Sequence, residues 1–90
     1  MEGFFRRYQN RVVLVDTDTR WIYLGTLVGE DETTITLSQA DAFDLSETTL
    51  TRQEYLLRVK QDGLVPNRRR VAILKTKVVA LTLWEDILTS

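Results

Sequence analysis

Five short runs rich in β-branched and apolar residues constrain the fold of this chain more than any other feature. Such residues disfavour helices and suit strands, because their side chains pack well on a pleated surface. Turn-forming residues separate the first three runs, and the last two follow each other almost without a break. The sequence therefore predicts five strands, at residues 11–16, 21–29, 34–45, 70–75 and 77–84, with the third less well defined after Ser38.

Two helices are predicted outside these runs. Near the N-terminus, Phe4, Phe5 and Tyr8 share one face of a two-turn helix that must dock on the sheet, with Asn10 as its stop. The expected order is helix, three strands, helix, two strands, and residues 85–90 are too few to contribute to the fold.

The second helix has strong local start and stop signals. Thr51 and Glu54 stand at the two positions of a capping box, where each side chain bonds the other residue's backbone N–H. Gly63 stands where a residue in the left-handed αL conformation ends a helix, and Pro66 prevents continuation. One face of this helix is expected to dock through Tyr55, Leu56 and Val59.

Gly25 interrupts the second predicted strand. A glycine in the middle of a strand indicates a sharp bend or the close approach of another backbone. We expect the aromatic residues to serve the core or subunit contacts rather than base stacking, namely Phe4, Phe5, Tyr8, Trp21, Tyr23 and Trp84.

Length and composition predict one folded domain with no obvious catalytic chemistry. Ninety residues make one domain with a thin core. The sequence has no cysteine and no histidine, which removes disulfides, thiolate metal sites and the usual general base. The acidic residues in the predicted turns lack the further oxygen ligands of a calcium loop, so no metal site is expected. The first ten residues lack the apolar run of a signal peptide, and we expect a cytoplasmic location.

Charge is distributed unevenly along the chain, although the net charge is only −1. Eight acids lie between residues 16 and 47, whereas residues 64–79 hold five bases and no acid. General nucleic-acid binders are usually net basic, which argues against that class. The basic segment is open to two interpretations, phosphate contact or a solvated loop that limits aggregation before an apolar strand. Its cations are Arg68, Arg69, Arg70, Lys75 and Lys77.

Two blocks of sequence have the spacing of known motifs. Val13, Val15, Gly25, Leu27 and Asp31 include the pattern G-x-L-x-x-x-D of the first Sm motif, and VAILKTKVVAL at residues 71–81 looks like the second motif. The chain thus resembles the Sm-like (LSm) family, as a divergent bacterial-type member. The resemblance implies a mostly β fold, a small and strongly bent five-stranded antiparallel Sm-like (SH3-like) barrel. It would carry a short N-terminal helix and a second helix inserted between strands three and four. The whole chain, residues 1–90, would then form a single domain with the insert at about residues 46–69.

The chain departs from the family at the positions that read bases. Members that bind uridine-rich RNA carry an asparagine a few residues after the motif aspartate, where this chain has Thr34 or Ile35. They carry Arg-Gly-Asn in the second motif, where residues 74–76 read Leu-Lys-Thr. The bacterial branch uses a Lys-His pair in that turn, but this chain has only lysines there. The base-reading residues of the family are therefore not transferable.

Two functions remain open at this point. The first is a non-catalytic, oligomeric Sm-like module that binds the backbone of single-stranded RNA through Arg68, Arg69, Arg70, Lys75 and Lys77. The alternative is a homo-oligomeric protein–protein scaffold that does not bind nucleic acid. We expect no enzymatic activity, no cofactor, no membrane association and no small-molecule substrate.

The resemblance also implies assembly through strand pairing between subunits into a ring. Unpaired edges that are apolar and β-branched invite such association, and the last two predicted strands have this character. Structural roles are expected for Gly25 and for Asp31, which should bond the backbone of its own turn. The residues predicted at the subunit interface are Val71, Ile73, Val79, Leu81 and Leu83.

Overall fold

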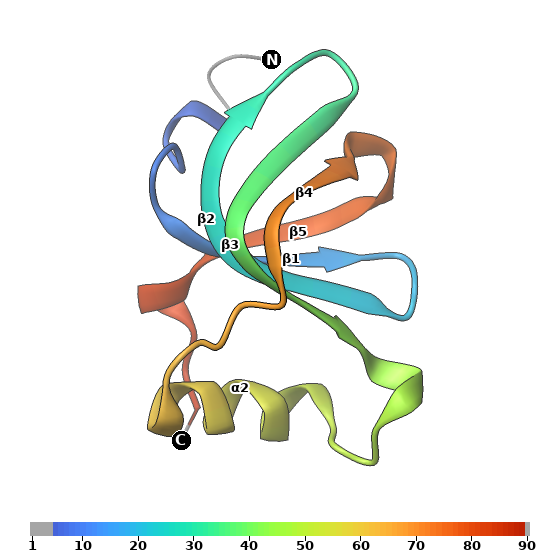
Figure 1. Ribbon diagram of the computed structural model, residues 1–90, viewed down its shortest axis with the longest axis vertical. Helices are drawn as coiled ribbons and strands as arrows, with labels where there is room; N and C mark the ends of the chain where they lie inside the picture. The colour runs from blue at the N-terminus through green and yellow to red at the C-terminus, as the bar shows by residue number, and fades with distance from the viewer. Residues whose placement is uncertain (1–4, 90) are drawn as a thin grey trace.

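The computed structural model describes residues 5–89, which form one curled sheet with a helix packed beneath it (Figure 1). The strands are β1 Val12–Thr17, β2 Trp21–Glu30, β3 Thr34–Asp44, β4 Arg68–Leu74 and β5 Val78–Leu83. Helix α2 spans Arg52–Asp62, and three short 3-10 turns are η1 Leu45–Glu47, η2 Lys75–Lys77 and η3 Trp84–Asp86.

The five strands form one antiparallel sheet in the order β4-β3-β2-β1-β5. The sheet is strongly bent, and β4 and β5 remain its two edges although only the turn η2 separates them in sequence. The prediction of a mostly β, strongly bent five-stranded antiparallel fold is confirmed. Strand β3 continues to Asp44, past the point where its sequence pattern weakens.

The inner face of the curled sheet holds the first of two buried clusters. Its central aliphatic residues are fully buried, and Phe5 and Ile73 close the cluster from outside the central strands. Complete burial of an aliphatic side chain contributes roughly 1.5–3 kcal/mol to folding, so this cluster is a main source of stability. The fully buried members are Val13, Val15, Leu27, Ile35, Leu37 and Ala40.

Gly25 lies at a close approach of β2 and β3. A Cβ atom on Gly25 would lie 2.8 Å from the Cβ and 2.9 Å from the Cα of Ala40. The register between β2 and β3 shifts at this point, and Gln39 has a positive φ of 48°. A glycine is required here because any side chain would meet the neighbouring backbone.

Helix α2 covers the outer face of the sheet and forms the second buried cluster. Tyr55, Leu56 and Val59 are buried against the outward-facing side chains of β1 and β2, which are Leu14, Ile22 and Leu24. The sheet is therefore apolar on both faces, which explains why β1 and β2 read as continuous apolar runs. The Tyr55 hydroxyl donates to Asp41 Oδ2 at 2.5 Å, and burial together with this bond raises the pKa of Tyr55.

The ends of α2 follow the local signals in most respects. Both bonds of the capping box are present, with Glu54 N to Thr51 Oγ1 at 3.1 Å and Thr51 N to Glu54 Oε1 at 2.8 Å. Gly63 ends the helix, and its N–H donates to Val59 O at 2.8 Å. Its φ of 93° is positive as expected, but its ψ of 161° lies outside the αL region that the sequence indicated.

The two chain ends differ from expectation in different ways. The predicted N-terminal helix begins at residues outside the described range. Within that range Phe5 and Arg6 are helical, and Asn10 has the positive φ of 63° that suits a stop. The prediction that residues after Trp84 add nothing is wrong, because Ile87 packs against the α2 cluster and Glu85 pairs with Arg11.

Candidate nucleic-acid interface

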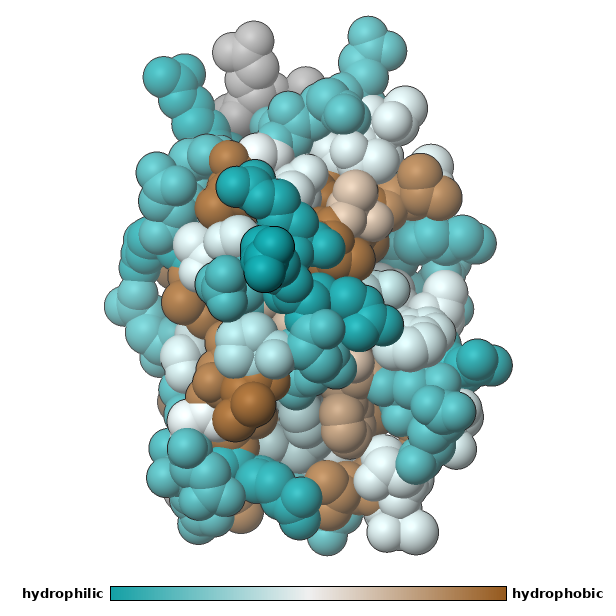
Figure 2. All heavy atoms as spheres, viewed as in Figure 1, coloured by the Kyte–Doolittle hydropathy of each residue, from teal (hydrophilic) through white to brown (hydrophobic). Residues whose placement is uncertain are grey.

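The three arginines open strand β4 rather than ending a loop. Arg68 pairs with Ala40 and Arg70 with Ser38 across the β3–β4 ladder, so their backbone is fixed. All three side chains are exposed, and the most hydrophilic colours gather over β4 in Figure 2. Arg68 donates to the carbonyl of Asn67, and within residues 5–89 none of the three arginines forms an ion pair. All three thus remain without an acidic partner in the described chain.

Lys75 lies at the other end of β4 and is engaged within the chain. Its Nζ lies 2.5 Å from Glu30 Oε2 and 5.1 Å from the centre of the Phe5 ring. Its backbone N–H donates to Thr33 O at 2.8 Å, which ties the start of η2 to the β2–β3 turn. The Lys75 side chain is only one-fifth exposed. Its charge is therefore compensated, and it holds two turns together.

Lys77 shares the turn with Lys75 but has a different environment. Its side chain is exposed, and within the described residues it forms no ion pair. Lys75 follows Arg69 by six positions along the chain, which at about 3.3 Å per residue of extended strand amounts to roughly 20 Å. The five predicted cations consequently form two groups at opposite ends of β4 instead of one basic cluster.

Asp31 organises the β2–β3 turn next to Lys75. Its Oδ1 accepts the backbone N–H groups of Thr33 at 2.9 Å and Thr34 at 2.8 Å, and the Thr34 hydroxyl at 3.0 Å. The backbone bonds from Thr33 and then Thr34 hold the pKa of the Asp31 carboxyl below its usual value. The motif acid thus fixes its own turn.

Most residues predicted at the subunit interface point into the barrel. Ile73 is buried, and Val71, Leu81 and Leu83 pack against the inner cluster, so their side chains hold the edge strands in place. Val79 is 68% exposed, because the register between β1 and β5 shifts and turns it outward. The surface available on the two edges consists of the strand backbones together with Val79 and the half-exposed Leu74.

A pocket of about 240 Å³ lies between the β1–β2 turn, the end of β4 and η2. Trp21 and Tyr23 provide its aromatic wall, with ring centroids 6.4 Å apart and planes 19° from parallel. Lys77 and Leu74 line the side that β4 and η2 form. Both aromatic residues are half-buried, and Tyr23 also packs against the inner cluster.

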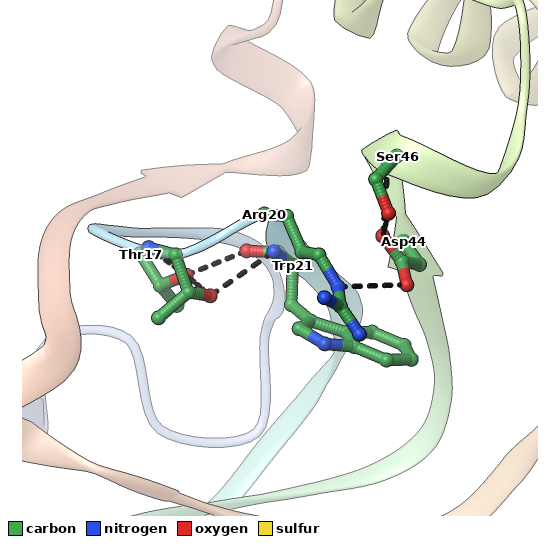
Figure 3. Close-up of polar contacts among 6 residues, drawn as sticks. Thr17, Arg20, Trp21, Asp44 and Ser46 are labelled. Atoms are coloured by element: carbon green, nitrogen blue, oxygen red, sulfur yellow. Dashed lines mark hydrogen bonds and ion pairs between the residues drawn. The ribbon is translucent and has the colours of Figure 1, made fainter.

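A network of hydrogen bonds fixes the backbone of Trp21 (Figure 3). The Thr17 hydroxyl donates to Trp21 O at 2.6 Å, and Trp21 N donates to the Thr19 hydroxyl at 3.0 Å. The neighbouring Arg20 Nε donates to Asp44 Oδ2 at 3.0 Å, which ties the start of β2 to the end of β3. Burial opposes ionisation of Asp44, but the bonds from Ser46 and the Arg20 charge outweigh it and lower the pKa of Asp44.

Sequence reasoning did not find this pocket as a site. Trp21 and Tyr23 alternate with their neighbours in β2, so the pattern alone places them on one face of the strand together with Gly25. The position of β4 decides whether a pocket forms beside these two rings. Its residues Ala72 and Ile73 line the pocket, and they lie about fifty residues further along the chain. The one local signal is the pair of threonines before Trp21, which favours an ordered turn.

Comparison with known proteins gives one clear answer at the level of fold. No family model matches the chain, and no curated protein matches it. Among solved structures it is similar to the Sm protein of Pyrococcus abyssii in complex with a uridine heptamer, with 19% identity and a TM-score of 0.60. The likeness covers 90% of this chain and 93% of that chain. The fold is Sm-like.

The Sm-like fold places the helical insert as the sequence predicted. Helix α2 lies between β3 and β4, and the five strands keep the predicted order around it. At 19% identity the likeness concerns the backbone, and the base-reading side chains have to be judged from this chain's own residues. Within residues 5–89, no helix is long and apolar enough to cross a membrane.

Proposed function

We propose that this chain is a self-assembling Sm-like module that binds single-stranded RNA chiefly through its phosphates. The observation that carries the proposal is the presence of exposed cations without acidic partners within residues 5–89, on an Sm-like fold with two free strand edges. These cations are Arg68, Arg69, Arg70 and Lys77. Phosphate neutralisation is the main source of sequence-independent affinity for nucleic acid.

Assembly is supported by the two edges of the sheet. Strands β4 and β5 each expose one row of unpaired backbone groups, and Leu74 and Val79 add apolar surface beside them. Such edges associate unless they are covered or charged, and after its three arginines β4 is uncharged from Val71 to Leu74. Pairing of β4 in one copy with β5 in the next is a head-to-tail contact, which closes into a ring when the rotation allows.

RNA as the ligand is supported by the structural neighbour, which was solved with a uridine heptamer. In this chain the candidate phosphate contacts are Arg68, Arg69, Arg70 and Lys77, whereas Lys75 serves to position the turn through Glu30. A ring repeats these cations in every subunit, so an assembly of chains with a net charge of −1 each can still present a basic circle. Because residues 74–76 are not Arg-Gly-Asn, we expect no preference for uridine.

The proposal is tested by fluorescence anisotropy with labelled single-stranded RNA of several sequences. The logarithm of the affinity should fall linearly with the logarithm of the salt concentration, by about 0.7 for each neutralised phosphate. Uridine, adenosine and mixed strands should bind alike. Absence of binding at about 50 mM salt, where such contacts are strongest, would reject RNA as the ligand.

A protein–protein scaffold that does not bind nucleic acid is the second candidate. It is favoured by the net charge and by Lys75, whose pairing with Glu30 removes one cation from the predicted RNA-binding set. The two candidates differ in one outcome of the anisotropy experiment. An assembled protein that binds none of the strands at low salt would support the scaffold.

A further inference from the structure

The pocket beside Trp21 combines an aromatic wall with a cation. We propose that it holds one nucleobase of a bound single strand, stacked on Trp21, while Lys77 contacts the adjacent phosphate. This inference rests on the proposed RNA-binding function and adds a subsite to it. The residues that define the subsite are Trp21, Tyr23, Leu74 and Lys77.

The first argument is that the backbone of Trp21 is held in place before any ligand arrives, while its ring lies nearly parallel to that of Tyr23. Its carbonyl accepts from Thr17 at 2.6 Å and its N–H donates to Thr19 at 3.0 Å, and these two hydroxyls lie 2.7 Å apart. The Arg20–Asp44 pair fixes the preceding residue. A binding surface that is already ordered loses little conformational entropy when it is occupied.

The second argument concerns charge. The lining of this pocket contains Lys77 and no carboxylate, so a phosphate nearby meets attraction only from the lining side chains. Two other pockets on the molecule differ in this respect. One is lined by Asp44, Glu47 and Arg68, and the other, between β3 and α2, by Asp41, Asp62 and Arg58. At each of them a phosphate would meet two carboxylates beside a single cation, and like charges repel at short range.

The third argument concerns size and chemistry. About 240 Å³ is below the roughly 300 Å³ at which pockets for drug-sized ligands begin, so the site suits one ring system rather than a longer ligand. Single-strand binders combine aromatic surfaces for bases with a basic track for the backbone. The pair of Trp21 and Tyr23 beside Lys77 supplies both elements within one pocket.

The test uses Trp21 as its own reporter. The full-length protein carries Trp84→Phe, which leaves Trp21 as the sole tryptophan, because the sequence contains two. Addition of single-stranded RNA should quench the Trp21 emission, in parallel with the anisotropy of a labelled strand. An abasic strand of equal length keeps the phosphates and should leave the emission unchanged.

Two variants separate stacking from folding in otherwise wild-type protein. Trp21→Ala should weaken RNA binding about tenfold and leave binding of the abasic strand unaltered, whereas Trp21→Phe, which retains an aromatic face, should recover most of the loss. Lys77→Ala should lower the salt slope by about 0.7, and Lys77→Arg should restore it. Circular dichroism of each variant shows whether the fold is kept.

The outcomes distinguish this inference from the function on which it rests. RNA binding that leaves the Trp21 emission unchanged would overturn the subsite and leave the proposed function standing. Emission that changes when the protein assembles, and not when RNA is added, would show that the next copy fills the pocket, which also overturns it. No binding of any strand would reject both proposals.

Discussion

Basic side chains lie at both ends of strand β4, but in the described part of the chain they are paired with an acid at one end and unpaired at the other. At the turn end, Lys75 is mostly buried and lies 2.5 Å from Glu30. At the starting end, Arg69 and Arg70 are exposed and have no acidic partner within residues 5–89. A run of basic residues in a sequence is therefore not enough to identify a phosphate-binding site. What distinguishes a binding cation from a structural one is whether the fold has already supplied its counter-charge.

The largest expected effect on stability is at Gly25, which faces Ala40, the β3 residue that pairs with the first residue of β4. Gly25→Val should lower the free energy of unfolding by about 2 kcal/mol or more, because its side chain meets Ala40, and Ala40 pairs with Arg68. Gly29→Val is the matched control, since a Cβ there meets nothing within 4 Å. Urea unfolding measures both, and equal midpoints would contradict the close approach of β2 and β3.

Removing the structural lysine should have the next largest effect. Lys75→Ala should lower the free energy of unfolding by about 1–2 kcal/mol, because the half-buried Glu30 loses its partner. Lys77→Ala, in the same turn, should change it by less than about 0.5 kcal/mol. Equal losses in the two variants, measured by urea unfolding, would remove the distinction between a paired and an unpaired cation.

A smaller effect is expected when pH is lowered, because Asp31 in the β2–β3 turn then loses its charge. The folded-state pKa of Asp31 is lowered by the backbone bonds from Thr33 and Thr34, so its contribution to stability is present above the unfolded pKa near 3.8 and is lost as pH falls through the folded value. Asp31→Asn should therefore flatten the fall in melting temperature below pH 4, whereas the exposed neighbour substitution Glu32→Gln should not. Parallel curves for wild type and Asp31→Asn would contradict this role.

The smallest effect on stability is expected at the starting end of β4. Replacing Arg68, Arg69 and Arg70 together with serine should change the free energy of unfolding by less than about 1 kcal/mol. The same variant should reduce the salt slope of RNA binding by about two, at 0.7 for each of three contacts. A triple variant that binds RNA with the wild-type slope would show that these arginines contact no phosphate.

Local signals predicted much of the fold correctly. The five apolar runs, the capping box of Thr51 and Glu54 and the apolar stripe of α2 each depend on residues close in sequence. The sequence also indicated the close approach at Gly25, because a glycine is unusual in the middle of a strand. Such local features can be predicted from the sequence before any tertiary contact is known.

The remaining features depend on residues that are distant in sequence. Strand β4 begins at Arg68 because the Asn67 side chain bonds both the N–H and the carbonyl of Ala42, at 2.8 and 3.0 Å. The pairing of Lys75 with Glu30 and the pocket beside Trp21 likewise arise only when β4 passes the β1–β2 and β2–β3 turns. No pattern within either segment indicates these contacts.

The most direct test of the account is the mass of the purified protein in solution, measured by light scattering before and after nuclease treatment. We predict a closed assembly whose mass is a multiple of 10.5 kDa and which keeps its subunit number after the nuclease removes bound RNA. Nuclease treatment should lower the total mass only by the nucleic acid that co-purifies. A mass of 10.5 kDa at micromolar concentration, with or without nuclease, would contradict assembly through β4 and β5.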